Sequence, residues 1–498
     1  MLARLIAHAA EFPARIALEG NGERLSYAQL ASAVDSLATQ LQRSRIRVLG
    51  VAMDNRPAWA ICDLAALAAG VTLVPLPPFF SAAQIQHALA DAGVQTVISD
   101  DPARFIAQAG TVLNASAFLK IDGIPLTRLD VPPDRVATAA TPPPEITKIT
   151  YTSGTTGTPK GVMLAWRHIE PVVRALSDAV DVQAGDRILA LNPLAVLLEN
   201  IGSVYVSIWA GATALLPALR ETGLSGASRV DGHRMTALLA ERRAKAAIFM
   251  PHTLLGVIEC LETTTRTLPD LRFAAVGGAA VSPRLLARAE ALGLPVFEGY
   301  GMSECASVMC LNKAGMNRPG SVGKPLPHLR MRIADDDDVQ VYGETSGGYL
   351  GDTARRTEAW WSTGDLGHFD ADGYLYLHGR RRNAFITAFG RNVAPEWVET
   401  ELTLEPAIAQ AAVFGEAREF NVAVLVAAAN ADAPTIDAAL QRANAALPDY
   451  ARVRHYLLAR EPFTPDNGLL TGTGRVRREA ILLAYREALE SLYAEEPR

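Results

Sequence analysis

A loop rich in glycine and hydroxyl side chains is the part of this sequence best suited to chemistry. The segment from Tyr151 to Leu164 reads YTSGTTGTPKGVML and follows a predicted strand. Glycines let backbone N–H groups point into a concavity, hydroxyls add donors, and Lys160 supplies a compact positive charge. This combination predicts a polyphosphate-binding loop. It is not the Walker pattern, because neither Ser nor Thr follows Lys160.

Three shorter segments carry less information when they are taken alone. GYGMSE, residues 299–304, is a glycine-rich turn that does not complete the GxGxxG pattern, so it does not predict dinucleotide binding. AVGGAA, residues 275–280, is the end of an apolar run, and STGD, residues 362–365, is a common turn sequence. Their significance depends on the elements that position them.

Those elements alternate between short apolar runs and amphipathic stretches from about residue 146 to 301. The amphipathic stretches, such as SPRLLARAEALG, predict helices, and the apolar runs predict buried strands. The runs are ITKITYTS, RILALNP, ATALLP, AAIFMP, LRFAAVGG and PVFEGYG. Such alternation predicts a mainly parallel sheet with helices on both faces, and ligands bind beyond the carboxyl ends of the strands of such sheets.

Two breaks divide the chain. The Pro-rich stretch of residues 131–145 predicts a linker between an N-terminal lobe and the central one. A second break lies near residues 379–383, after a hairpin-like run that begins at Asp372. Beyond it, NVAPEWVETEL predicts a turn and a helix, and AIAQAAVFG and NVAVLVAAA predict strands of a small α+β unit. The acidic run from Asp335 to Asp338 is predicted to be a solvated turn.

Composition excludes some functional classes. The chain has 498 residues, enough for roughly three domain-sized units. Its 47 basic and 53 acidic side chains give a net charge of −6, and its aromatic residues are not interleaved with basic ones, so a nucleic-acid-binding surface is not expected. The cysteines are too few and too irregularly spaced for a disulfide scaffold or a zinc site, and we expect buried free thiols. They are Cys62, Cys260, Cys305 and Cys310.

Neither a signal peptide nor an integral membrane segment is predicted. Charged residues such as Arg4 and Glu11 interrupt the apolar N-terminus. The uncharged segment from Ile201 to Leu219 is long enough to span a membrane. Glycine, serine and proline interrupt it, however, and Gly211 predicts a helix end followed by a turn and a short buried strand. We therefore expect a cytoplasmic protein.

The phosphate-binding segment resembles the signature of the adenylate-forming enzymes, a superfamily of acyl-CoA synthetases, adenylation domains of peptide synthetases and luciferases. The likeness continues in the family's order along almost the whole chain, and long-chain fatty acyl-CoA synthetases are the most similar group. It implies an α/β fold whose large N-terminal domain, residues 1–379, has mainly parallel sheets sandwiched by helices. A hinge at 380–383 and a small mobile α+β C-terminal domain, 384–498, would follow, and rotation about the hinge would switch adenylation to thioester formation.

The resemblance also implies ATP and Mg²⁺ as cofactors and assigns roles to residues. Of the implied catalytic residues, Lys160 would hold the departing phosphates, Glu304 would bind Mg²⁺ and Arg475 would contact the reacting phosphate. Arg382 would be the hinge residue. The implied ATP- and AMP-binding residues, among which Asp365 and Arg380 would hold the ribose and phosphate, are Thr152, Ser153, Gly154, Thr155, Thr156, Gly157, Gly278, Ala279, Tyr300, Gly301, Ser303, Asp365 and Arg380.

Two positions depart from the family's pattern. Arg475 occupies the place of a lysine that stabilises the charge formed when the carboxylate attacks the α-phosphate, and no other lysine of the chain lies nearby. Arginine keeps the charge but not the compact ammonium geometry. Losing one well-placed electrostatic contact costs about 10²- to 10³-fold in rate. Long-chain members usually carry a histidine where this chain has Val196.

The segment from Asn192 to Ile201 indicates the substrate. Amino-acid-activating relatives bind the amino group with an aspartate here, whereas this chain offers Leu194, Ala195, Val196, Leu197 and Leu198. This apolar run suits an acyl chain better than an ammonium group, although the same run could form a core helix. Three hypotheses follow: a fatty acyl-CoA synthetase, an acyl-AMP ligase that loads the phosphopantetheine of an acyl carrier protein, and a nucleotide- or acyl-binding protein in which Arg475 impairs adenylation.

Overall fold

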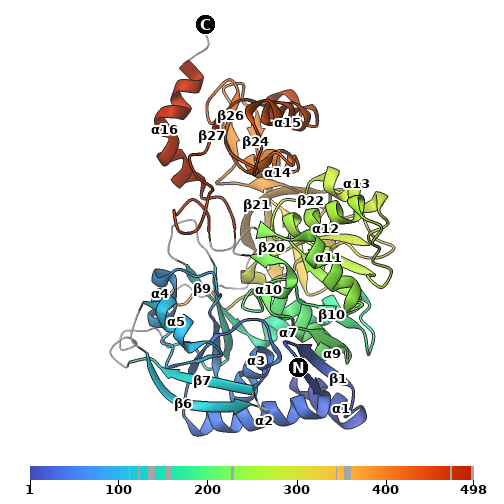
Figure 1. Ribbon diagram of the computed structural model, residues 1–498, viewed down its shortest axis with the longest axis vertical. Coiled ribbons are helices and arrows are strands. Elements are labelled where there is room, and N and C mark those ends of the chain that lie inside the picture. The colour runs from blue at the N-terminus through green and yellow to red at the C-terminus, as the bar shows by residue number, and fades with distance from the viewer. Residues whose placement is uncertain are drawn as a thin grey trace.

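The chain folds into alternating layers of helix and sheet, with a smaller unit at its C-terminal end (Figure 1). The computed structural model describes residues 1–110, 113–121, 124–132, 141–152, 159–225, 229–343, 345–352, 360–471 and 474–494. The α/β fold expected from the sequence is confirmed: two large sheets, each with parallel central strands, are covered by helices.

The larger sheet has the strand order β18-β17-β16-β15-β14-β10-β11-β1-β2 in the described part of the chain. Its strands from β16 to β1 are all parallel, whereas β2, β17 and β18 pair antiparallel. The bounds are β1 Ile16–Gly20, β2 Glu23–Ser26, β10 Arg187–Leu189, β11 Thr213–Leu215, β14 Ala246–Phe249, β15 Phe273–Val276, β16 Val296–Tyr300, β17 Cys310–Leu311 and β18 Lys324–Pro325.

The second large sheet has the order β6-β7-β5-β3-β4-β8-β9, and its central strands β5, β3, β4 and β8 are parallel. Its strands are β3 Val48–Ala52, β4 Thr72–Pro75, β5 Thr96–Ser99, β6 Asn114–Ile121, β7 Ile124–Asp130, β8 Ile146–Thr152 and β9 Lys160–Ala165. A four-stranded antiparallel sheet follows in the chain, with β19 Leu329–Ile333, β20 Asp338–Gly343, β21 Trp361–Phe369 and β22 Leu375–Arg380.

Helices fill the space between the large sheets and cover their outer faces. The central layer comprises α2 Tyr27–Arg43, α3 Pro57–Ala69, α7 Trp166–Val180 and α9 Val206–Ala210. On the outer face of the first sheet lie α11 Gly232–Glu241, α12 Pro251–Thr263 and α13 Pro283–Ala291, and on that of the second lie α4 Ala82–Asp91 and α5 Pro102–Ala109 (Figure 1). Short pieces complete the set: α1 Leu2–Glu11, α8 Leu197–Glu199, α10 Leu219–Thr222, and the strand pair β12 Leu224–Ser225 and β13 Arg229–Val230.

The C-terminal unit begins after β22 and has its own sheet, whose two faces each carry a separate apolar core. The strands are β25 Ile408–Phe414, β26 Asn421–Ala427 and β27 Val453–Leu458, and the hairpin β23 Phe385–Ile386 with β24 Asn392–Val393 precedes them. The helices are α14 Pro395–Thr403, α15 Ala433–Ala445 and α16 Arg478–Ala494. The helix and the two strands predicted from the sequence are therefore confirmed.

Two sequence predictions need correction. The run ITKITYTS forms β8, but it pairs with β4 and β9 in the second sheet rather than joining the strands predicted after it. In the acidic run, Asp335 to Asp337 are exposed as expected, whereas Asp338 is buried at the start of β20 and pairs with Arg381 at 3.2 Å. An ion pair therefore stabilises the last of the four carboxylates. Most of the predicted linker, residues 133–140, lies outside the described residues.

The uncharged segment after residue 200 is broken as the sequence predicts. It forms the π-helix η1, Asn200–Tyr205, then α9, which ends at Gly211 in the left-handed conformation, and then the buried strand β11. Within the described residues, every helix is too short or too polar to cross a membrane. All four cysteines are buried free thiols, as expected.

A buried ion pair joins the second sheet to the helical layer between the sheets. Lys148 of β8 pairs with Asp63 of α3 at 3.0 Å, and both side chains are only 2% exposed. Lys148 also donates to Asn200 and to the Tyr205 hydroxyl of η1, and Asn200 donates to Asp63. Removing one partner of such a pair leaves a charge that is buried without compensation.

We expect Lys148→Met to lower the free energy of unfolding by about 3–5 kcal/mol, because it leaves Asp63 charged and buried. The matched control is Lys245→Met, since Lys245 pairs with Asp270 at 2.7 Å but is 34% exposed. The decrease in the free energy of unfolding of Lys245→Met should stay within about 1 kcal/mol. Urea denaturation followed by circular dichroism measures both, and equal losses would contradict the prediction.

Candidate active site

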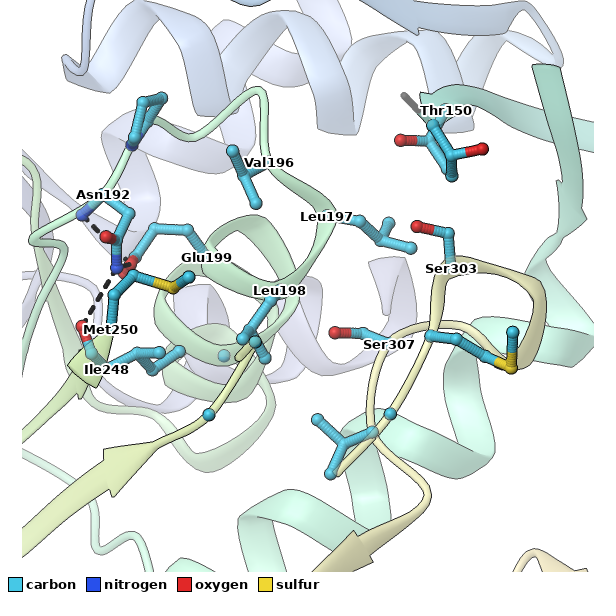
Figure 2. A pocket seen from close by; sticks show the side chains of 18 of the residues that line it. Thr150, Asn192, Val196, Leu197, Leu198, Glu199, Ile248, Met250, Ser303 and Ser307 are labelled. Carbon is cyan, nitrogen blue, oxygen red and sulfur yellow. Dashed lines mark hydrogen bonds between the residues drawn. The ribbon is translucent and has the colours of Figure 1, made fainter. Parts of the chain in front are cut away.

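A large cavity opens at the carboxyl ends of β14, β15 and β16. Its volume is about 1330 Å³, and Met250, Gly278 and Tyr300 line it at or just beyond the ends of these three strands. This is the edge at which open parallel sheets bind ligands. Gly301 allows the chain to turn back here, because a Cβ atom at this position would lie 1.6 Å from the carbonyl oxygen of Ser307. The turn directs Ser303 and Ser307 toward the cavity (Figure 2).

An aspartate links two side chains of the cavity wall. Asp365 of β21 accepts a hydrogen bond from the hydroxyl of Tyr300 at 2.5 Å and pairs with Nε of Arg380 at 3.0 Å. Asp365 and Arg380 are cross-strand neighbours in the β21–β22 hairpin, so the sheet register holds the pair together. Burial, reinforced by the Asp365 charge, raises the pKa of Tyr300 well above its usual range. The tyrosine is therefore a neutral hydrogen-bond donor.

A second carboxylate lies beside the described end of the glycine-rich loop. Glu304 is buried in the short helix η2, Ser303–Cys305, and accepts a hydrogen bond from the Tyr349 hydroxyl at 2.6 Å. The ammonium group of Lys160, at the start of β9, lies 5.1 Å from the centre of the Tyr349 ring. Lys160, Glu304 and Tyr349 all line the cavity. An anionic and a cationic group thus share one aromatic neighbour.

Arginines add positive charge on the side of the C-terminal unit. Arg475 lies in a turn closed by a hydrogen bond from Thr471 N to Arg475 O at 2.7 Å. Its guanidinium donates to the carbonyl of Gly278 at 2.8 Å, so it bridges the C-terminal unit and the first sheet. Burial and the charge of Arg380 lower the pKa of Arg382, which lines the same cavity. A group destabilised in this way gains from a bound anion.

The cavity brings together most of the site residues predicted from the sequence. Its lining includes Thr152, Lys160, Gly278, Tyr300, Gly301, Ser303, Glu304, Arg380, Arg382 and Arg475. Asp365 does not line it but holds two residues that do. Ala279 is exposed and is not part of the lining. The loop residues Ser153, Gly154, Thr155, Thr156 and Gly157 lie outside the described residues.

The opposite section of the cavity is apolar. Ala195, Val196, Leu197 and Leu198 line it, so most of the predicted apolar run forms a wall of the cavity (Figure 2). Leu194, the remaining residue of the run, is buried in the core instead. Buried hydrogen bonds fix this wall. Glu199 accepts from the backbone N and side-chain Nδ2 of Asn192 at 3.1 and 2.6 Å and also from Ser203. Burial raises the pKa of Glu199 to about 7 despite these hydrogen bonds.

Several of these residues could not be found from the sequence. Tyr349 follows a Gly-Gly dipeptide and belongs to none of the recognised motifs, although it contacts both Lys160 and Glu304. Glu199 ends the apolar run, where a carboxylate ordinarily marks the return to solvent. The only sequence signal for Glu199 was its position next to the apolar residues. That signal was not enough to predict burial, because charged side chains are almost never fully buried unless they are paired.

A polar contact joins the two parts of the chain outside the cavity. Glu401 of α14 accepts a hydrogen bond from the Ser282 hydroxyl at 2.6 Å, and Arg284 of α13 pairs with Glu401 at 3.4 Å and with Glu405 at 3.1 Å. Leu404 packs in the apolar cluster on the outer face of the first sheet. These contacts, with the Arg475 hydrogen bond, hold the C-terminal unit over the cavity.

Comparisons with known proteins agree with this geometry. The family model of the AMP-binding enzymes matches residues 5–350, and that of the AMP-binding enzyme C-terminal domain matches residues 383–497. The chain is 29% identical to the long-chain-fatty-acid–CoA ligase FadD15 of Mycobacterium bovis, over 89% of this chain and 87% of that protein. It is 27% identical to the indoleacetate–CoA ligase of Aromatoleum aromaticum, over 95% and 96% of the two chains.

A solved structure shares the fold. The o-succinylbenzoate CoA synthetase of Bacillus subtilis, in complex with an acyl-adenylate intermediate, superposes with a TM-score of 0.76 at 22% identity, over 96% of this chain and 97% of that one. The chain belongs to the AMP-binding enzyme family. It is an acyl-CoA synthetase-like ligase of the AMP-forming acid–thiol class, which works with ATP, Mg²⁺ and CoA, so the resemblance noted from the sequence is confirmed.

A further carboxylate of β16 lies close to the site without lining the cavity. Glu298, two residues before Tyr300, is 7% exposed, and its Oε2 has no hydrogen-bond partner among the described residues. Burial raises its pKa from 4.5 to about 8. Between pH 4.5 and about 8, Glu298 is therefore protonated in the folded protein but ionised in the unfolded chain. The free energy of unfolding decreases as the pH rises through this range.

We expect Glu298→Gln to be more stable than the wild type by a few kcal/mol at pH 8 and to match it at pH 5, because the amide stays neutral throughout. Chemical denaturation at the two pH values tests this expectation. Glu290→Gln on the exposed end of α13 is the matched control and should follow the wild type at both. A stability difference between Glu298→Gln and the wild type that does not change with pH would contradict the assignment.

Proposed function

We propose that this enzyme activates a medium- or long-chain fatty acid with ATP, forming acyl adenylate and pyrophosphate, and then transfers the acyl group to CoA with release of AMP. One observation carries the proposal: a single cavity joins a polar end, lined by Lys160, Glu304 and Arg475, to an apolar interior. An amphiphilic acid whose carboxylate must meet ATP requires this combination. Relatives act on acids as different as indoleacetate and oxalate, so the substrate class is inferred from the residues that line the cavity.

The apolar interior runs between the first sheet and the central helices. It is lined by Leu176 and Val180 of α7, Val206 of α9, Ile188 of β10, and Ala246 and Phe273 at the amino ends of β14 and β15. Since the polar section lies at the carboxyl ends of β14 and β15, the cavity follows these strands for their length, roughly 10 Å for four residues. An apolar space of this length favours an extended alkyl chain over a compact polar acid.

The polar end supports roles for several of the predicted residues. Asp365, which already accepts from Tyr300 and Arg380, offers carboxylate oxygens to ribose hydroxyls. Lys160 and the glycine-rich loop would hold the β- and γ-phosphates. Arg475 would stabilise the charge that forms when a carboxylate oxygen bonds to the α-phosphorus and the bond to pyrophosphate breaks. Positioning and fixed charges of this kind supply most of the catalysis in such displacements.

Glu304 fits the metal that accompanies ATP. Mg²⁺ in such sites is held by one or two carboxylates together with the substrate phosphates. Glu304 is one carboxylate at the phosphate end of the cavity, and the described residues contain no cluster of three or more metal-ligating side chains that would form a site from protein alone. Mg²⁺ would neutralise phosphate charge during the displacement. The Tyr349 hydroxyl would orient Glu304 for this task.

Movement of the C-terminal unit would separate the two half-reactions. The hinge proposed at residues 380–383 lies between β22 and β23, where the four-stranded sheet ends. In the arrangement described, Arg475 reaches the cavity, which suits the adenylation step. Rotation about Arg382 would withdraw Arg475 and would break the contacts of Ser282 and Arg284 with Glu401, leaving room for the thiol. Hinges of this kind absorb backbone rotation at the ends of elements.

The acceptor is proposed to be CoA, as in the relatives. Another part of the cavity wall supports this choice: Phe79, Phe80, Gln84 and Arg104 line it on the side of the second sheet. Aromatic rings and a guanidinium suit the adenine and phosphate groups of CoA. A carrier protein remains the alternative, and it would need a protein-binding surface in addition.

The first test is ATP/pyrophosphate exchange with fatty acids from short to long. We expect the wild type to show exchange with a maximum at one medium or long chain length. Lys160→Ala and Arg475→Ala should each lose about 10²- to 10³-fold in rate, whereas Arg475→Lys should retain exchange. Arg477→Ala, an exposed neighbour that does not line the cavity, is the control. Absence of exchange in the wild type with every fatty acid would contradict the proposal and favour the binding-protein hypothesis.

The second test concerns the acceptor. We expect Arg104→Ala to raise KM for CoA roughly tenfold, the value of one charge-assisted hydrogen bond, while ATP/pyrophosphate exchange stays unchanged. Arg43→Ala at the exposed end of α2 is the control. Acyl-CoA formation is measured beside the loading of an acyl carrier protein. Faster transfer to the carrier protein than to CoA would overturn the CoA assignment.

A further inference from the structure

A glycine and an isoleucine in the wall of the apolar cavity lie very close together. Gly202 of η1 and Ile248 of β14 both line the cavity. A Cβ atom at Gly202 would lie only 2.4 Å from Cδ1 of Ile248 and 3.6 Å from its Cγ1. Figure 2 shows Ile248 and Met250 on the strand side of the cavity, which Leu198 also lines. The glycine leaves just enough room for the isoleucine side chain.

The two residues divide the cavity along the direction of the strands. Ile248 lies beside Ala275 in the register of β14 and β15. Two residues earlier, Ile188, Ala246 and Phe273 lie side by side on three neighbouring strands and line the distal section. The distal level is therefore about 7 Å from that of Ile248 along the strands. Along the strands, Ile248 therefore lies between the polar end and the distal section.

The backbones on both sides of this contact are held by buried hydrogen bonds. Glu199 accepts hydrogen bonds from Ser203 and Asn192, and Asn200 donates one to Asp63. The chain is therefore held at Glu199 and Asn200, where η1 begins. On the opposite side, the carbonyl of Ile248 accepts from Nδ2 of Asn192 at 3.0 Å. Neither backbone can readily shift, so the side chain of Ile248 is the part that can respond to a change in size.

We propose that Gly202 and Ile248 set the length of acyl chain that the enzyme accepts, with the Ile248 side chain as a partial stop that limits entry into the distal section. This inference rests on the proposed fatty acid substrate. A larger residue at 202 pushes Cδ1 of Ile248 into the path of the chain and shortens the accepted acid. A smaller residue at 248 widens the entry to the distal section and favours longer acids.

The test is a double-mutant cycle, with kcat/KM measured for saturated fatty acids of increasing length. Valine lacks the Cδ1 atom that would clash, so Ile248→Val removes the contact and leaves the backbone unchanged. We expect Gly202→Ala to lower the ratio of kcat/KM for a long over a shorter acid by about tenfold, and Ile248→Val to raise it by a similar factor. In the double variant the glycine substitution should have almost no further effect.

The controls separate selectivity from stability. Ile258→Val deletes the same atom from a fully buried isoleucine of α12 that does not line the cavity, and it should leave the ratio unchanged. Melting temperatures check that each variant folds. If Gly202→Ala does not fold, Ile248→Val and Ile248→Ala still test the stop, with the larger gain expected for alanine.

The outcomes distinguish this inference from the function on which it rests. If exchange is normal and every variant has the same kcat/KM ratio for long over shorter acids as Ile258→Val, the role of Gly202 and Ile248 is overturned but the proposed function stands. Independent, additive effects of the two substitutions overturn the contact between them. Absence of exchange with every fatty acid in the wild type overturns the proposed function and this inference with it.

Discussion

The parallel pairing of β14, β15 and β16 is the constraint on which the site depends. Because these strands run in one direction, their carboxyl ends meet at one edge, and the segments that follow them, around Met250, Gly278 and Tyr300, converge there. Small residues on the face toward the central helices, among them Ala246, Ala275 and Gly299, keep space open below that edge. The same sheet thus provides a polar rim and an apolar interior.

Fixed polar contacts hold the rest of the structure against this sheet. The β21–β22 hairpin places Asp365 and Arg380 opposite Tyr300, and the network of Lys148, Asp63 and Asn200 joins η1 to the second sheet. Each of these contacts has at least one buried member, so it is specific in geometry and costly to leave incomplete. The cavity keeps its shape because its walls come from elements that are tied to one another at such points.

Much of the fold could be read from the sequence, because each strand of the central region is a short apolar run that ends at a turn residue. Pairing partners could not be read in this way: the run that forms β8 is as apolar as the others, yet it belongs to the second sheet. Site residues within motifs, such as Lys160 and Glu304, were predicted. Tyr349 and Glu199 were not, because their significance comes from contacts that only the folded chain creates. Asp338 was misjudged for the same reason, since its partner Arg381 lies far along the chain.

The close approach of Gly202 to Ile248 also bears on how substrate range evolves in such an enzyme. Every glycine codon becomes an alanine codon by a single base change, and so does an isoleucine codon become a valine codon. Both ends of the contact can therefore be altered in one mutational step without touching the residues that handle ATP. With the role proposed for this contact, a lineage carrying this fold would drift between acids of different length while its adenylation chemistry stayed under unbroken selection.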